Sequence, residues 1–234
     1  MKFARPARNG KSARMKITYY LEVTSSWCYW AEPMWAELKR RYAARAEFHW
    51  KIAQMHARDY PTSREQCDWF YRRSGLVVRS PFMLSSAWFE PVAEGTVVAP
   101  NLVAEAARDF GFNGDEVRLA LSHAGKRDGK RVLQMPVAIE VAVHAGNGKL
   151  TPETLRVRAE SPEVRSRVLA SSQEFATHQI TQRPAFILED KIGDKAVFSG
   201  LVNIEPLAAT IDAMLSDVAA YAAHAAHYGA PPKK

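Results

Sequence analysis

The sequence predicts an α/β protein whose small sheet is interrupted along the chain by a long helical segment. Two observations lead to this fold class. Segments with strand character stand at residues 16–24 and 46–52 with a helix between them, and a strand–turn–strand pattern with a final helix follows after residue 183. Between these two parts the pattern is helical throughout. The predicted order is therefore strand–helix–strand, a helical insertion, then strand–strand–helix.

The first part is predicted from β-branched and aromatic residues, which favour a buried strand at 16–24. Ser25 and Ser26 follow and are good helix N-caps. A helix is expected over 27–45, although it contains a proline. Residues 46–52 alternate in character and predict a second strand. A helix that connects two parallel strands forms a βαβ unit.

Helical patterns fill the middle of the chain, punctuated by glycines. The segments expected to be helical are 63–74, 80–92, 98–110, 114–124, 129–144 and 162–178. After them, 184–189 and 195–199 predict a β-hairpin around a D-K-I-G-D turn, and 204–228 predicts an alanine-rich helix. We therefore expect residues 15–57 and 179–234 to form one domain and 58–178 to form a helical insertion domain.

Composition excludes several classes of protein. The chain has 234 residues, of which 47% are apolar and 24% charged, so it is neither disordered nor a disulfide-rich miniprotein. The net charge is +7, but residues 1–16 carry six Lys or Arg and no acid, which leaves +1 for the remainder. A nucleic-acid partner is therefore not expected. Residues 1–14 are expected to be a disordered basic tail, and Met15 is a candidate for the native start.

Two further absences in the sequence bear on function. No apolar run approaches the length of about 18–20 residues that a membrane helix needs, so no membrane partner is expected. Two cysteines, Cys28 and Cys67, do not make a disulfide framework, and a cytoplasmic location is expected.

His56 is a candidate acid–base group, and His224 with His227 are expected to be surface residues, so no metal is expected.

The stretch S-S-W-C at residues 25–28 stands where the first strand ends and the first helix begins. A helix N-terminus presents unpaired N–H groups and the positive end of the helix dipole. That environment stabilises a thiolate and lowers the pKa of a thiol. Thiol chemistry is therefore expected at Ser25 and Cys28, which are the candidate catalytic residues.

This stretch, together with Q-R-P-A-F at 182–186, resembles the DsbA-like branch of the thioredoxin superfamily. That branch includes FrnE-like oxidoreductases, kappa-class glutathione transferases and 2-hydroxychromene-2-carboxylate isomerases. The resemblance implies a thioredoxin-like fold with a helical insertion. It places Ser25 at the first cysteine of the Cys-x-x-Cys motif, which gives an S-x-x-C motif, and Pro184 at the cis-proline.

The resemblance implies a thiol-dependent oxidoreductase, transferase or isomerase. In the transferases and isomerases a serine in this position stabilises the thiolate of bound glutathione, which makes glutathione the implied cofactor. Ser26, Trp27, Arg183 and Pro184 are the implied substrate-binding residues, with the backbone of Arg183 pairing with the ligand and its side chain available to a carboxylate. The implied partners are a small thiol, an apolar or aromatic small molecule, and a second copy of the chain in a homodimer.

Alternatives remain open at this level. Cys28 is either a nucleophile or a packed, assisting residue, and Cys67 is expected to be structural, although a Cys28–Cys67 disulfide is conceivable. The aromatic residues at 69–71 and 88–89 form either the core of the insertion or the wall of an apolar pocket. Two other functions compete with the first: a monothiol redox protein that acts through Cys28, and a non-catalytic thioredoxin-fold binding module.

Overall fold

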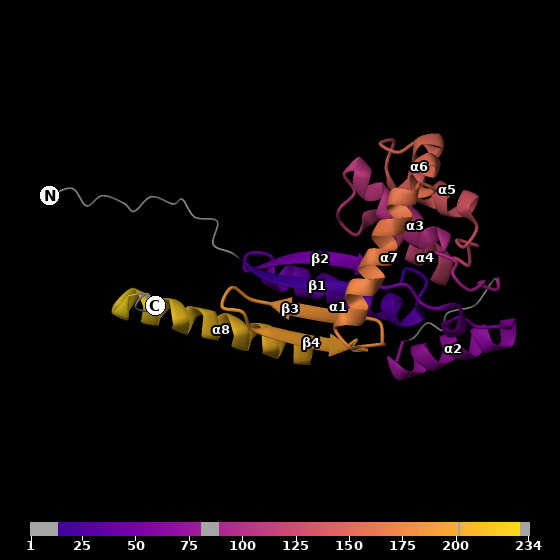
Figure 1. Ribbon diagram of the computed structural model, residues 1–234. Helices are drawn as coiled ribbons and strands as arrows, with labels where there is room; N and C mark the ends of the chain where they lie inside the picture. The colour runs from indigo at the N-terminus through magenta and orange to yellow at the C-terminus, as the bar shows by residue number, and fades with distance from the viewer. Residues whose placement is uncertain (1–13, 81–88, 201, 230–234) are drawn as a thin grey trace.

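The computed structural model describes residues 14–80, 89–200 and 202–229. Its sheet contains β1 (Met15–Leu21), β2 (Ala46–Ile52), β3 (Ala185–Glu189) and β4 (Lys195–Ser199) in the order β2-β1-β3-β4. β1 runs parallel to β2 and antiparallel to β3, and β3 runs antiparallel to β4. The segments predicted on either side of the helical region thus pair directly with each other at the centre of one sheet (Figure 1).

The two faces of the sheet are covered by different helices. On one face, Tyr19 of β1 and Phe186 of β3 stack with ring centroids 4.8 Å apart, against α1 (Ser26–Tyr42) and α8 (Glu205–Tyr228). The Tyr42 hydroxyl of α1 donates a hydrogen bond to a backbone carbonyl of α8, and Figure 1 shows α8 lying along the sheet. Side chains on a strand alternate between faces, so the next residue of β1 points to the opposite side.

The opposite face of the sheet packs against α7 (Pro162–Thr177). Tyr20 of β1 contacts Phe175 of α7, with ring centroids 5.6 Å apart, and Ile187 of β3 joins the same apolar cluster. In Figure 1, α7 descends from the group of inserted helices onto the sheet. It therefore joins the helical part of the chain to the sheet.

The helical part of the chain lies between β2 and β3. It contains α2 (Arg64–Val77), α3 (Ala99–Ala107), α4 (Glu116–Lys126), α5 (Met135–Ala145), α6 (Pro152–Ala159) and α7, with single 3₁₀ turns at Ala57–Asp59 and Arg108–Phe110. Figure 1 shows α3 to α7 gathered at one end of the sheet and α2 apart from them. The division into domains at residues 57/58 and 178/179 stays a prediction.

Several predicted elements differ from the structure or lie outside the described residues. The first strand ends at Leu21, because the next residues turn back and the Ser25 N–H donates to the Glu22 carbonyl at 3.0 Å. The helix predicted from residue 129 begins only at Met135, where a proline in the first turn favours a helix start. α6 was not predicted, because it is short and buries only Leu155 and Ala159. Of the predicted helix at 80–92, residues 81–88 lie outside the described chain and 89–92 are not helical.

The predicted basic tail and the question of its start also fall on residues that the structure does not describe, since 1–13 are outside it. Within the described residues, no helix has both the length and the apolar character needed to cross a membrane. The predicted C-terminal hairpin and the long last helix are confirmed as β3, β4 and α8.

A buried ionic network joins α1 to α4. Arg118 of α4 is 1% exposed and donates to both carboxylate oxygens of Glu32 at 2.6 and 3.0 Å. The same guanidinium donates to Asp115 at 2.7 and 3.0 Å. Bidentate arginine–carboxylate pairs fix geometry as well as charge. The network therefore sets how the inserted helices sit beside α1, whose N-terminus carries the candidate motif.

Candidate functional site

Ser25 is the N-cap of α1. Its Oγ accepts a hydrogen bond from the Cys28 N–H at 3.3 Å, as expected of a capping serine. The side chain uses its oxygen as an acceptor there, which leaves the hydroxyl proton available for a second partner. Ser25 is 7% exposed and lines a pocket together with Ser26 and Trp27. The structure thus brings three of the predicted site residues to one cavity.

A buried carboxylate holds the turn that leads into α1. Glu22 is 0% exposed, and its Oε2 accepts hydrogen bonds from the Met55 N–H at 3.1 Å and from the Asn101 side-chain amide at 2.8 Å. Its Oε1 accepts from the Thr24 hydroxyl at 3.1 Å. Sequence analysis missed Glu22. The signal was a single acid at the end of an otherwise apolar strand, where burial demands several hydrogen-bond donors.

Cys28 is buried and does not line the pocket. It is 2% exposed, and its Sγ accepts a hydrogen bond from the Glu22 N–H at 3.5 Å. Burial raises the pKa of the Cys28 thiol to about 11, although the hydrogen bonds from Glu22 and Ser25 act to lower it. The expectation that the helix N-terminus lowers the pKa of this thiol was therefore wrong, because desolvation outweighs the helix dipole. Cys28 and Cys67 are both free, with no disulfide between them.

Arg183 and Pro184 lie outside the lining of this pocket. The peptide bond between them is cis, the geometry that the resemblance to DsbA-like proteins implied. The Arg183 guanidinium donates to the carbonyls of Ala53 and Gln54, the latter at 2.6 Å, and stacks on the Phe175 ring at 5.1 Å. Its guanidinium therefore holds the loop after β2. The predicted contact between this side chain and a ligand carboxylate stays a prediction.

The pocket has mostly apolar and aromatic walls. The empty space in it amounts to about 750 Å³, a figure that includes open solvent at its mouth. Its apolar and aromatic lining residues are Trp27, Met55, Tyr60, Pro61, Phe70, Tyr71, Phe89 and Leu133. Trp69 is 56% exposed, and Trp88 lies outside the described residues. Of the two interpretations of the aromatic run, the pocket wall therefore fits Phe70, Tyr71 and Phe89.

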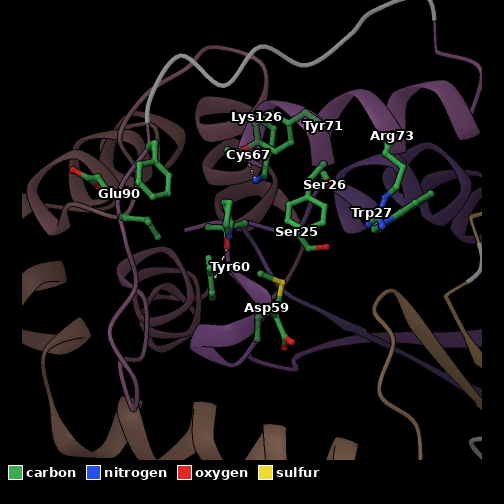
Figure 2. A pocket seen from close by; sticks show the side chains of 16 residues that line it. Ser25, Ser26, Trp27, Asp59, Tyr60, Cys67, Tyr71, Arg73, Glu90 and Lys126 are labelled. Atoms are coloured by element: carbon green, nitrogen blue, oxygen red, sulfur yellow. Dashed lines mark hydrogen bonds between the residues drawn. The ribbon is translucent and has the colours of Figure 1, made fainter. Parts of the chain in front are cut away.

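One wall of the pocket carries polar groups that sequence analysis did not find. Figure 2 shows Lys126 of α4 grouped with Cys67 and Tyr71 of α2. Lys126 Nζ donates to the Tyr71 hydroxyl at 2.8 Å. Burial lowers the pKa of Lys126 to about 8, against smaller raising effects from Cys67, Glu22 and Cys28. Only the tertiary fold brings Lys126 of α4 to these residues of α2.

The histidines contribute little to this site. His56 precedes the pocket-lining Asp59, but it is exposed and does not line the pocket itself. His224 and His227 are exposed on α8, with their rings against Tyr228. In the parts of the chain that the structure describes, no group of three or more His, Cys, Asp or Glu side chains could hold a metal ion.

Solved structures resemble this chain across most of its length. A candidate protein disulfide isomerase from Nitrosomonas europaea has a TM-score of 0.68 and 19% identity, covering 87% of this chain and 98% of its own. The cytosolic disulfide reductase DsbM from Pseudomonas aeruginosa has a TM-score of 0.67 and 19% identity, covering 86% and 98%. Its structure with glutathione (GSH) has a TM-score of 0.64 and 18% identity, covering 86% and 99%.

No protein-family model and no curated protein sequence matches the chain. The structural likeness covers both the sheet and the inserted helices, because it spans nearly the whole of each solved chain. At these identities it establishes the fold. The chain therefore has the thioredoxin-like fold with a helical insertion that characterises DsbA-like proteins.

Proposed function

We propose that this protein is a thiol-dependent enzyme that binds a small thiol, glutathione being the first candidate, with the Ser25 hydroxyl donating a hydrogen bond to the thiolate. The observation that carries this proposal is the position of Ser25. Its oxygen caps α1, its proton is available, and its side chain lines the pocket. A hydroxyl donor at a helix N-terminus stabilises an anionic sulfur.

The reactive thiol comes from the ligand in this proposal, because the protein's own motif cannot supply it. Serine does not exchange disulfides, and the Cys28 thiol is buried with its pKa raised to about 11. Nucleophilic chemistry needs the thiolate form. The structure of DsbM with glutathione supports a thiol ligand in a fold of this kind.

In this proposal, other elements of the fold bind the rest of the thiol ligand and the second substrate. The backbone of Arg183, beside Pro184, pairs with the extended part of the thiol ligand. The aromatic walls receive an apolar or aromatic second substrate, at the boundary between the sheet and the inserted helices. A cytoplasmic location suits the two free cysteines. The homodimer stays a prediction.

One alternative is a binding module without catalysis, and the lack of a Cys-x-x-Cys pair favours it. Such a module would hold its ligand without changing the pKa of the ligand's thiol. The other alternative, a monothiol redox protein acting through Cys28, lacks support from the structure because that thiol is both inaccessible and protonated.

The test measures the pKa of the glutathione thiol when it is bound to the protein, followed by the ultraviolet absorbance of the thiolate. Ser25→Ala removes one hydrogen bond to a charged group, which should raise the bound thiol's pKa by about 1 to 2 pH units. S-methylglutathione, which has no thiol, should bind the wild type and Ser25→Ala equally well. Ser25→Thr, which keeps the hydroxyl, should retain the low pKa.

The control for the lost helix cap is Ser161→Ala. Ser161 caps α7 and accepts the Val164 N–H at 3.3 Å, the same distance as in the Ser25 cap. Each alanine variant should lose about 1 kcal/mol of stability, but only Ser25→Ala should raise the pKa of the bound glutathione thiol. Lack of glutathione binding, or a bound thiol whose pKa is the same with serine and alanine, would contradict the proposal.

A further inference from the structure

In the described residues, the pocket contains a buried cation that no carboxylate contacts directly. Lys126 is 6% exposed and lines the cavity. Across the described residues, its hydrogen-bond partner is the neutral hydroxyl of Tyr71, and no carboxylate lies within 4 Å of its ammonium nitrogen. An ammonium group has three donors, so further donors of Lys126 are open to a ligand.

The other charged groups that line the cavity do not neutralise Lys126. Asp59 accepts the His56 N–H at 3.1 Å and lies 4.0 Å from the Arg58 guanidinium. Glu90 accepts from the Gln134 side chain at 2.5 Å. Both acids thus have partners outside the pocket.

A second cation, Arg73, is exposed at the same cavity. Its guanidinium stacks on the rings of Trp69 and Phe70 at 5.0 and 5.1 Å. It makes no ion pair with a carboxylate in the described parts of the chain. An interior ammonium and an outer guanidinium therefore face a cavity whose remaining lining is mostly apolar.

A buried, unpaired charge is costly, and proteins usually pair it or bury a neutral residue instead. Lys126 keeps its charge at neutral pH, because its pKa of about 8 remains above 7. An anionic group of a ligand would supply the missing counter-charge in a water-poor site, where a charge-assisted hydrogen bond is strong.

We propose that the pocket binds an apolar small molecule that carries a carboxylate, and that Lys126 is the residue that recognises this carboxylate. The apolar body lies against Phe70, Tyr71 and Phe89 while the carboxylate reaches the Lys126 ammonium. This inference deepens the proposed function, on which it rests, by naming the chemical class of the second substrate. Arg73 assists at the outer end of the cavity.

The test uses the full chain with a matched pair of probes, 2-naphthoate and its neutral amide, 2-naphthamide. Binding is followed by calorimetry. The wild type should bind naphthoate at least about tenfold more tightly than naphthamide, the lower end of what a charged hydrogen bond contributes. Lys126→Met should bind the two probes with equal affinity.

Lys130→Met provides the control. Lys130 lies four residues away, is exposed, and pairs with Glu140 at 3.5 Å, outside this pocket. The Lys130→Met variant changes the net charge by the same amount as Lys126→Met. It should leave the preference for naphthoate over naphthamide intact. Equal binding of the two probes by the wild type, no binding of either, or a preference that survives in Lys126→Met would overturn the inference.

Glutathione supplies a separate arm, because it carries carboxylates of its own. If Lys126→Met abolishes glutathione binding and naphthoate does not bind the wild type, Lys126 recognises the thiol ligand, and the inference fails while the proposed function stands. The other outcome is that naphthoate binds through Lys126 while the pKa of the bound glutathione thiol is the same in the wild type and in Ser25→Ala. The proposed function then fails, and the carboxylate site stands as a binding site.

Discussion

Replacement of Lys126 by methionine should make the protein more stable at neutral pH. Burial lowers the pKa of Lys126 from its usual 10.5 to about 8. This difference of about 2.5 pH units corresponds to roughly 3 kcal/mol, by which folding disfavours the charged lysine. The variant leaves the Tyr71 hydroxyl without its donor, which costs about 1 kcal/mol. A net gain of about 2 kcal/mol is therefore expected, since methionine fills a similar volume with apolar atoms.

The pH dependence of this gain follows from proton binding. Below pH 8 the lysine is charged in both the folded and the unfolded chain, so the full penalty is present. Between pH 8 and 10.5 the unfolded chain binds more protons than the folded one, and the stability of the wild type rises with pH. The advantage of Lys126→Met should therefore shrink across that window. The titratable groups that act on Lys126, which are Cys67, Tyr71, Glu22 and Cys28, remain in both proteins.

Urea unfolding at pH 7, 9 and 10 would measure this. With a denaturant slope of about 2 kcal/mol per molar urea, the midpoint of Lys126→Met should lie about 1 M above that of the wild type at pH 7. Lys130→Met, at an exposed position, should unfold within about 0.5 kcal/mol of the wild type. A less stable Lys126→Met at pH 7, or an advantage that does not shrink by pH 10, would refute the reasoning. A less stable variant at pH 7 would mean that Lys126 already has a counter-charge, and an unchanged advantage at pH 10 would mean that the gain does not come from the charge of Lys126.

Three further predictions concern the residues around α1. In a Cys67→Ser variant, Cys28 should react with a disulfide reagent at pH 8 roughly a hundredfold more slowly in the folded protein than in urea. The reason is that Cys28 is buried and its pKa is raised to about 11. Equal rates in the folded protein and in urea would show that the Cys28 thiol is accessible. Arg118→Met should lower the free energy of unfolding by about 3–5 kcal/mol in urea titrations, since it leaves the Glu32 carboxylate buried and unpaired, and the added change Glu32→Met should recover most of the loss. Ser25→Cys should introduce a thiol with a pKa below about 8.5 at the pocket, and insulin reduction should then be faster than with the wild type. A new thiol with an ordinary pKa would count against the influence of the helix N-terminus.

Residues that act through local chemistry were largely predicted from the sequence. Ser25 was placed at the start of α1 because a serine at the end of a strand is a good N-cap, and the structure has it in that role. Strand β2 has the predicted bounds, because alternation of side chains over Ala46–Ile52 is a strong local signal. Residues 22–24 were assigned to the first strand, because composition alone does not reveal that Glu22 is held by donors from other segments.

Burial and long-range contacts decided the rest. A cysteine near a helix N-terminus is consistent with either a reactive or an inert thiol, and only the packing around Cys28 shows that desolvation prevails. The guanidinium of Arg183 meets backbone carbonyls from the loop after β2, which lies about 130 residues earlier in the chain. Lys126 carries no local sign of function.

The sequence by itself determined the order of strands and helices, the insertion between them and the capping serine, because these depend on periodicity and on neighbours within a few residues. Only the tertiary structure decided which groups at the site are charged and accessible. It buries Cys28, sets the Arg183 guanidinium against backbone carbonyls after β2, and places Lys126 beside Tyr71 in a cavity that Ser25 also lines. The physical reason is that desolvation and ion pairing depend on the three-dimensional surroundings of a group, which come from segments distant in the chain.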